Sequence, residues 1–202
     1  MLTIALPKGR IAEETLDKFE KAFGEKFVFE DRKLILKKSG FTFLNVRNQD
    51  VPTYVMHGAA DLGVVGLDVL EEKEYDLIKL LDLELGKCKV AFGLRKGEKL
   101  NFDKSKITIA TKHEKIAKKF FEQKAMAVEI IKLYGSIELA PLVGLCDCIV
   151  DIVETGETMK QNGLEVGPTI MESSAHLIAN KNSFYAKKDL ILDLKEKIEV
   201  HL

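Results

Sequence analysis

The chain has 202 residues, 46% of them apolar and 31% charged, and its 31 basic and 32 acidic side chains nearly cancel. These values are typical of a folded globular protein and exclude a largely disordered chain. A near-zero net charge provides no overall field for nucleic acid, although a local basic patch could still bind a polyphosphate. No stretch reaches the ~18 to 20 apolar residues that span a bilayer, and the N-terminal apolar run is shorter than a secretion signal requires. We expect a cytoplasmic protein that binds neither nucleic acid nor membrane.

Strand-like and helix-like segments alternate along the chain. Strands are predicted at residues 2–6, 33–37, 41–46, 62–65, 77–83, 89–94, 106–110, 128–131, 148–153 and 176–179. Helices are predicted at residues 10–22, 51–57, 137–143 and 187–198, between the strand at 106–110 and Lys124, and from Thr155 onward. This alternation indicates an α/β fold with mostly parallel sheets.

Two pairs of segments resemble each other. Residues 3–12 (TIALPKGRIA) resemble residues 108–117 (TIATKHEKIA), and residues 58–64 (GAADLGV) resemble residues 144–150 (GLCDCIV). We infer two lobes of related topology, with lobe I formed by residues 1–94 and 172–202 and lobe II by residues 95–171. The matches are short, so chance similarity stays an alternative. Two such lobes predict a ligand between them, near the carboxyl ends of the strands.

The segment DIVETGETM (151–159) runs from an apolar strand into Thr155, Gly156, Glu157 and Thr158. Unpaired backbone N–H groups at such a strand-to-helix turn favour an anion, and Gly156 allows close approach of the backbone. An ordinary helix N-cap at Thr155 accounts for the pattern equally well.

Basic residues form two further candidate anion sites. Lys8, Gly9 and Arg10 lie between the first strand and the first helix, and two cations flanking a glycine suit a polyphosphate. Arg32 and Lys33 add two cations in the same half of the chain. A solvated surface turn is the alternative for both segments, and the charged run at 112–124 is predicted to be a solvated helix face.

Glu138 and Asp151 are acids near the proposed site of the second lobe. Asp151 lies inside an apolar strand, where an unpaired carboxylate is costly, so either sugar hydroxyls or protein donors are expected to satisfy it. Cys146 and Cys148 alternate in an apolar run and are expected to share one face of a strand. Together with Cys88 they make an odd count without nearby histidines, which favours reduced thiols over a metal site.

Three segments together resemble the ATP phosphoribosyltransferase family. They are LPKGR (6–10), RNQDVPTYVMHGAADLGVVGLDVL (47–70) and ELAPLVGLCDCIVDIVETGETM (138–159). The last segment follows the family's pattern of Glu, five residues, Gly, then Ile/Val-x-Asp-Ile, two residues and Thr-Gly-x-Thr nearly throughout. Cys146 is the one departure, at a position where the pattern favours Ser, Ala or Gly.

The resemblance implies a two-lobed fold like that of type II periplasmic binding proteins, with a small, mostly parallel sheet flanked by helices in each lobe. The chain resembles the short form of the family, which lacks a C-terminal regulatory domain. Such chains work with a regulatory subunit that resembles histidyl-tRNA synthetase, so a hetero-oligomer, expected to be a hetero-octamer, is implied.

The resemblance also implies a reaction between ATP and 5-phosphoribosyl 1-diphosphate, with Mg²⁺ carried by the substrate phosphates and no direct metal ligand on the protein. The implied phosphoribosyl diphosphate site comprises Glu138, Asp151, Thr155, Gly156, Glu157 and Thr158. The implied ATP and diphosphate contacts are Lys8, Gly9, Arg10, Arg32, Lys33, Asp61 and Cys88, with Arg10 and Arg32 catalytic. A bilobal small-ligand-binding protein and another kind of phosphoribosyltransferase are the rival hypotheses.

Overall fold

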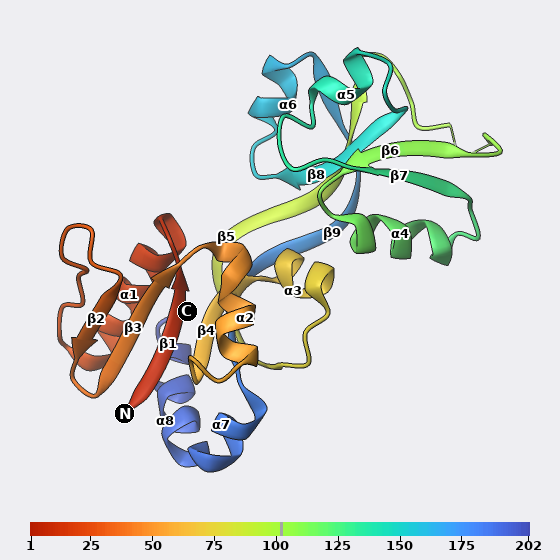
Figure 1. Cartoon of the computed structure of the whole chain (residues 1–202). Coiled ribbons are helices and arrows are strands. Elements are labelled where there is room, and N and C mark those ends of the chain that lie inside the picture. The colour runs from red at the N-terminus through yellow and green to blue at the C-terminus, as the bar shows by residue number, and fades with distance from the viewer. Residues whose placement is uncertain (102) are drawn as a thin grey trace. The chain divides into compact units, whose positions relative to one another are not determined.

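The computed structural model describes residues 1–101 and 103–202 and has the expected α/β architecture (Figure 1). It forms two compact units: unit 1 comprises Met1–Gly86 and Ser174–Leu202, and unit 2 comprises Lys87–Ser173. Two long strands, β5 (Ile78–Arg95) and β9 (Leu164–Ala179), carry the chain from one unit to the other. The unit boundaries lie inside these strands, at 86/87 and 173/174, whereas the boundaries predicted from the sequence are 94/95 and 171/172.

In unit 1 the strand order is β2-β3-β1-β4-β9. Its elements are β1 (Leu2–Pro7), α1 (Arg10–Phe23), β2 (Ile35–Lys38), β3 (Phe41–Val46), the 3-10 helix η1 (Asn48–Asp50), α2 (Val51–Met56), β4 (Leu62–Gly66), α3 (Leu67–Lys73), α7 (Lys181–Ala186) and α8 (Lys188–Glu199). β1 is parallel to β3 and to β4, whereas β2 and β9 run antiparallel to their neighbours. The carboxyl ends of β1, β3 and β4 therefore meet at one edge, called the carboxyl edge of unit 1.

Alternation along β1 sorts the helices of unit 1 onto two faces of the sheet. Leu2, Ile4 and Leu6 are buried in the core formed with α1 and α8, whereas Ala5 is buried in the core formed with α2 and α3. Successive strand residues point to opposite faces, so one strand supports both layers. Phe19 of α1 is fully buried and contacts other phenylalanine rings edge-on.

In unit 2 the strand order is β5-β8-β6-β7. Its further elements are β6 (Ile107–Thr111), α4 (Glu114–Gln123), β7 (Val128–Lys132), α5 (Leu139–Leu142), β8 (Cys148–Val153) and α6 (Glu157–Gln161). β6 is parallel to β7 and β8, and β5 is antiparallel to β8. Figure 1 shows α4 on one side of these strands and α5 and α6 on the other, and the carboxyl ends of β6, β7 and β8 define the carboxyl edge of unit 2.

The predicted internal repeat is confirmed by strand register. In unit 1, Ile4 of β1 lies opposite Leu62 of β4. In unit 2, Ile109 of β6 lies opposite Cys148 of β8. These are equivalent positions of the two repeated segments, so the same parallel pair of strands recurs in both units.

Several predicted elements need correction. The segments predicted at 77–83 and 89–94 form the single strand β5, and the strand predicted at 176–179 is only the end of β9. α3 and α7 are not among the predicted elements. Cys146 packs with α5 and α6, whereas Cys148 packs with α4, so the expectation that they share a strand face is wrong. The reason is that Cys146 lies in the turn before β8 and not in the strand. All three cysteines are free thiols.

Candidate functional site

The turn between β1 and α1 lies at the carboxyl edge of unit 1. The Lys8 backbone N–H donates to the carbonyl of Val46 at the end of β3 (2.8 Å), which fixes the turn against the neighbouring strand. Gly9 has φ 100° and ψ −154°, a conformation that is accessible in practice only to glycine. Arg10 then begins α1, with its Nε 3.6 Å from Glu14 Oε1 and its side chain 58% exposed.

Arg32 and Lys33 lie at the same edge. The carbonyl of Leu34 accepts a hydrogen bond from the N–H of Asn45, one residue before the end of β3, so the two preceding residues extend past that strand. Both side chains are exposed, and Lys33 forms an ion pair with Glu30. The structure therefore brings the cations of the two predicted basic segments to one edge of unit 1.

Asp61 lies at the opposite, amino edge of unit 1, and the structure does not bring it to the predicted site. Its carboxylate accepts hydrogen bonds from the Thr3 backbone N–H (2.9 Å) and from Lys187 Nζ (2.8 Å to each oxygen). Burial alone raises the pKa of Asp61, but the hydrogen bonds from Lys187 and Thr3 outweigh it and hold the pKa below its usual value. These contacts give Asp61 a structural role.

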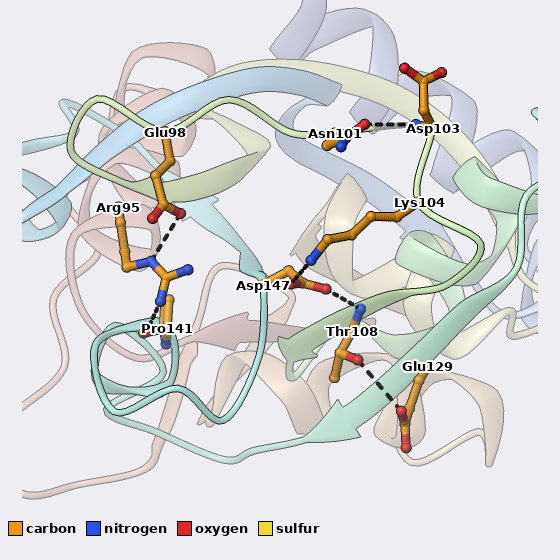
Figure 2. Close-up of polar contacts among 9 residues, drawn as sticks. All are labelled: Arg95, Glu98, Asn101, Asp103, Lys104, Thr108, Glu129, Pro141 and Asp147. Carbon is orange, nitrogen blue, oxygen red and sulfur yellow. Dashed lines mark hydrogen bonds and ion pairs between the residues drawn. The ribbon is translucent and has the colours of Figure 1, made fainter.

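Unit 2 has an equivalent arrangement at its own amino edge. Figure 2 shows Lys104 and the backbone N–H of Thr108 directed at Asp147, with distances of 2.6 and 2.9 Å to its carboxylate oxygens. The hydrogen bond from Lys104 is the main cause that lowers the pKa of Asp147, and the Thr108 N–H adds to it. Lys104 and Asp147 also line a pocket of about 230 Å³. Arg95, another residue of its lining, already donates hydrogen bonds to Glu98 and to the carbonyl of Pro141.

The loop after β8 lies at the carboxyl edge of unit 2. Gly156 adopts the left-handed conformation (φ 81°), and a Cβ there would lie 2.9 Å from Val166 Cγ2, so the position requires glycine. Thr155 and Thr158 are exposed. The expectation that Thr155 begins the helix is wrong: Gly156 is the N-cap of α6, and the Thr155 hydroxyl instead accepts the Glu157 N–H at 3.3 Å.

Three more of the predicted residues lie near the carboxyl edge of unit 2. Asp151 lies in β8, two residues before the strand ends. Glu138, half-buried, precedes α5 in the connection from the carboxyl end of β7. Cys88 precedes Lys89, which pairs with Val153, so this half-buried thiol lies beside the start of the loop.

Two residues at these edges are absent from the predicted set. Asp68 is buried in the first turn of α3, directly after β4, at the carboxyl edge of unit 1. Lys112 follows β6, and its Nζ lies 3.0 Å from Asp151 Oδ1. The internal repeat provides a signal for Lys112, because it aligns residues 111–115 with the Leu6–Arg10 turn. Asp68 falls within the second family segment, directly after a buried strand.

Comparison with known proteins decides the family. The family model HisG, ATP phosphoribosyltransferase, matches residues 47–200. ATP phosphoribosyltransferase from Sulfurovum sp. (strain NBC37-1) is 67% identical over 199 residues, 98% of this chain and 97% of the relative. The chain belongs to the ATP phosphoribosyltransferase family. The enzyme from Wolinella succinogenes is 68% identical over 197 residues, 98% of this chain and 96% of the relative. These near-complete matches agree with the short form of the family.

Solved structures agree with this family and its fold. The ATP phosphoribosyl transferase (HisG:HisZ) complex from Thermotoga maritima matches with a TM-score of 0.84 and 36% identity, over 98% of this chain and 97% of that chain. The substrate binding protein of an amino acid ABC transporter matches with a TM-score of 0.61 and 13% identity, over 98% of this chain and 91% of that chain. The second likeness is one of fold alone, and it agrees with the binding-protein-like fold that the family resemblance implies.

The described residues contain no helix long and apolar enough to cross a membrane. In the same part of the chain, no group of three or more His, Cys, Asp or Glu side chains is arranged to hold a metal ion. The candidate edges instead offer cations, hydroxyls and backbone N–H groups, which are donors suited to phosphate.

Proposed function

We propose that this chain is the catalytic subunit of an ATP phosphoribosyltransferase, a pentosyltransferase. It joins ATP to 5-phosphoribosyl 1-diphosphate and forms 1-(5-phospho-β-D-ribosyl)-ATP and diphosphate, the first step of L-histidine biosynthesis. Family membership over nearly the whole chain carries this proposal. The phosphate-suited turns at the carboxyl edges of both units support it.

The chemistry requires little proton transfer from the protein. N1 of adenine carries no proton, so it attacks the anomeric carbon directly, and the carbon–oxygen bond to diphosphate breaks with its electron pair leaving on diphosphate. Catalysis then depends on positioning the two substrates and on stabilising the charge that moves onto the leaving group. Cationic turns without a general base suit such a reaction.

In this proposal unit 2 holds the phosphoribosyl group. The turn Thr155–Thr158 supplies hydroxyls and backbone N–H groups to the 5-phosphate, since the first N–H groups of a helix have no intrahelical acceptor. Glu138 and Asp151 accept hydrogen bonds from the ribose hydroxyls. Cys88 lines the adenine region.

We assign to the cations of unit 1 the binding of the ATP phosphates and of diphosphate. Lys8 and Arg10 flank Gly9, whose backbone lacks a Cβ and leaves open space for an oxyanion. Arg32 and Lys33 extend the same positive edge. Asp61 is left out of the proposed site because its carboxylate is already bonded to Lys187 and Thr3.

We propose that magnesium is bound by the phosphates of the substrate. The turns present donors that bind phosphate oxygens, so we place Mg²⁺ on the diphosphate of the substrate and not on protein ligands. When bound there, it neutralises charge on the leaving diphosphate.

The partner follows from the relative of known structure. The Thermotoga maritima protein is described as a HisG:HisZ complex, and this chain is 36% identical to it. We therefore propose a HisZ-type regulatory subunit as the partner of this chain, in a hetero-oligomer. The free thiols of this chain, Cys88, Cys146 and Cys148, fit a reducing compartment, and we propose that the enzyme is cytoplasmic.

Diphosphate release tests the proposal directly. We expect release only when ATP and phosphoribosyl diphosphate are both present, measured with and without a HisZ-type subunit. Replacing ATP with a free nucleobase is the control for other phosphoribosyltransferases. Thr158→Val is expected to raise KM for phosphoribosyl diphosphate without changing KM for ATP. Absence of turnover with both substrates and the regulatory subunit would overturn the proposal.

A further inference from the structure

Asp151 is held in an asymmetric way. Its Oδ1 accepts the backbone N–H of Ile152 at 2.8 Å and lies 3.0 Å from Lys112 Nζ. The Nε2 atom of His113 lies 3.8 Å from the same oxygen. No hydrogen bond of Asp151 Oδ2 occurs within residues 1–101 and 103–202, and the side chain keeps 15% of its surface exposed. One carboxylate oxygen is therefore anchored, and the other is available to an incoming donor.

Strand pairing fixes the backbone position of Lys112. Thr111, the last residue of β6, lies opposite Val150, so the residues that follow each of them are adjacent. The Thr111 hydroxyl donates to the Val150 carbonyl (2.6 Å) and accepts the His113 N–H (2.8 Å). This short network fixes the turn on both sides of Lys112 and directs it toward Asp151.

We propose that Lys112 is a positioning residue that orients the Asp151 carboxylate for the hydroxyls of the phosphoribosyl substrate. The inference rests on the proposed function, because it assumes that Asp151 faces the ribose. The terminal torsion of an aspartate is broad and nearly two-fold, so a carboxylate held only by the adjacent Ile152 N–H samples several orientations. The ammonium at Oδ1 removes this freedom and compensates the partly buried negative charge.

Direct binding of a substrate phosphate is the competing role for this ammonium, since 38% of the Lys112 side chain is exposed. The two roles differ in how Lys112 depends on Asp151. A positioning residue loses its effect when Asp151 no longer carries a charged carboxylate, whereas a phosphate ligand keeps its effect. A double-mutant cycle separates them.

The experiment uses the full chain with a HisZ-type subunit and compares Lys112→Gln, Lys112→Arg, Asp151→Asn and the double variant Lys112→Gln with Asp151→Asn. Lys118→Gln is the matched control, because Lys118 lies on α4 with its side chain 66% exposed and its Nζ 3.7 Å from Glu122. We expect Lys112→Gln to raise KM for phosphoribosyl diphosphate about tenfold, as for the loss of one partly buried ion pair, with KM for ATP unchanged. Lys112→Arg should restore most of the affinity.

In the Asp151→Asn background, Lys112→Gln should add no further loss. An equal, additive loss in that background would assign Lys112 to the substrate phosphate and overturn the positioning role. An unchanged KM in Lys112→Gln, with wild-type turnover intact, would also overturn it while leaving the proposed function standing. Failure of the wild-type protein to turn over would instead remove the proposed function. Thermal melting of each variant excludes misfolding as the cause.

Discussion

The two units are alike at their amino edges and different at their carboxyl edges. In unit 1 the Asp61 carboxylate accepts the Thr3 N–H at 2.9 Å and Lys187 at 2.8 Å. In unit 2 Asp147 accepts the Thr108 N–H at 2.9 Å and Lys104 at 2.6 Å. Each aspartate also donates its own N–H to the carbonyl of the same threonine, at 2.8 Å in both units. Each unit thus joins its parallel pair of strands by the same arrangement of an aspartate, a threonine and a lysine, called the carboxylate clasp: Asp61, Thr3 and Lys187 in unit 1, and Asp147, Thr108 and Lys104 in unit 2.

The carboxyl edges have diverged in residue type. Unit 1 presents a Lys-Gly-Arg turn there, whereas the equivalent turn of unit 2 contains Lys112, which forms an ion pair with Asp151. Unit 2 adds the turn around Gly156 after β8. What the repeat keeps in both units is structural, and what it changes is the chemistry offered to a ligand. By this criterion Asp61, which has a counterpart in Asp147, belongs to the structural set.

The largest expected effect is at Arg10, which the repeat aligns with Lys115. Removing a cation that stabilises the leaving diphosphate should lower kcat about 100-fold in Arg10→Ala. The melting temperature should hardly change, because Arg10 is exposed and its 3.6 Å ion pair with Glu14 lies on the surface. Lys115→Ala is the matched control and should retain nearly full activity. A fall in the melting temperature of Arg10→Ala large enough to account for its lost activity would contradict the assigned role.

Asp61→Asn should produce the next largest effect, on stability and not on chemistry. It removes a buried carboxylate and leaves Lys187 without its counter-charge, which should lower the free energy of unfolding by about 2 to 3 kcal/mol. The measurement is chemical denaturation. The double variant with Lys187→Met should lose less than the sum of the single variants, since the two side chains act as a pair. A selective rise of KM for ATP without loss of stability would return Asp61 to the site.

Local pattern predicted most of the elements and the repeat, because buried strands and amphipathic helices are encoded by neighbouring residues. β8 matches its predicted bounds, and β1 and α1 each differ from theirs by one residue at the C-terminal end. The pattern predicts β5 as two separate strands because residues 84–88 between them are exposed or half-buried, which gives little apolar signal. It predicts only the end of β9 because residues 165–172 are likewise exposed or half-buried.

The partners of the aspartates could not be predicted in this way. Lys187 reaches Asp61 across 126 positions of the chain, and Lys104 reaches Asp147 across 43. Such pairs depend on the tertiary arrangement, and the residue types alone do not select among the chain's many lysines. The charged run at 112–124 predicts a solvated helix face for Lys112, its first residue. The structure instead places it before α4, in contact with Asp151.

Gly156→Ala tests whether the turn that distinguishes unit 2 depends on its backbone. The left-handed conformation costs a residue with a Cβ about 1 to 2 kcal/mol, and the new Cβ would meet Val166 at 2.9 Å. We expect a loss of stability of that size and a raised KM for phosphoribosyl diphosphate, measured by denaturation and by steady-state kinetics. Gly163→Ala is the control, because Gly163 has a similar φ of 76° and a Cβ added there would meet nothing within 4 Å. It should lose stability but keep its KM.

The smallest effect concerns acid stability and compares the two clasps directly. Asp147→Asn should lower the free energy of unfolding by about 1 kcal/mol, less than Asp61→Asn, because 31% of the Asp147 side chain is exposed and solvent screens its pair with Lys104.

Both aspartates have a lowered pKa in the folded state. Their stabilising contribution is therefore present above the unfolded pKa of about 3.9 and is lost as the pH falls through the lower folded value. Between neutral pH and about pH 4 the difference between each variant and the wild type should stay constant, and it should shrink at lower pH. Denaturation curves across this range measure it, and a difference that instead shrinks as the pH rises would show that the carboxylates do not act through their charge.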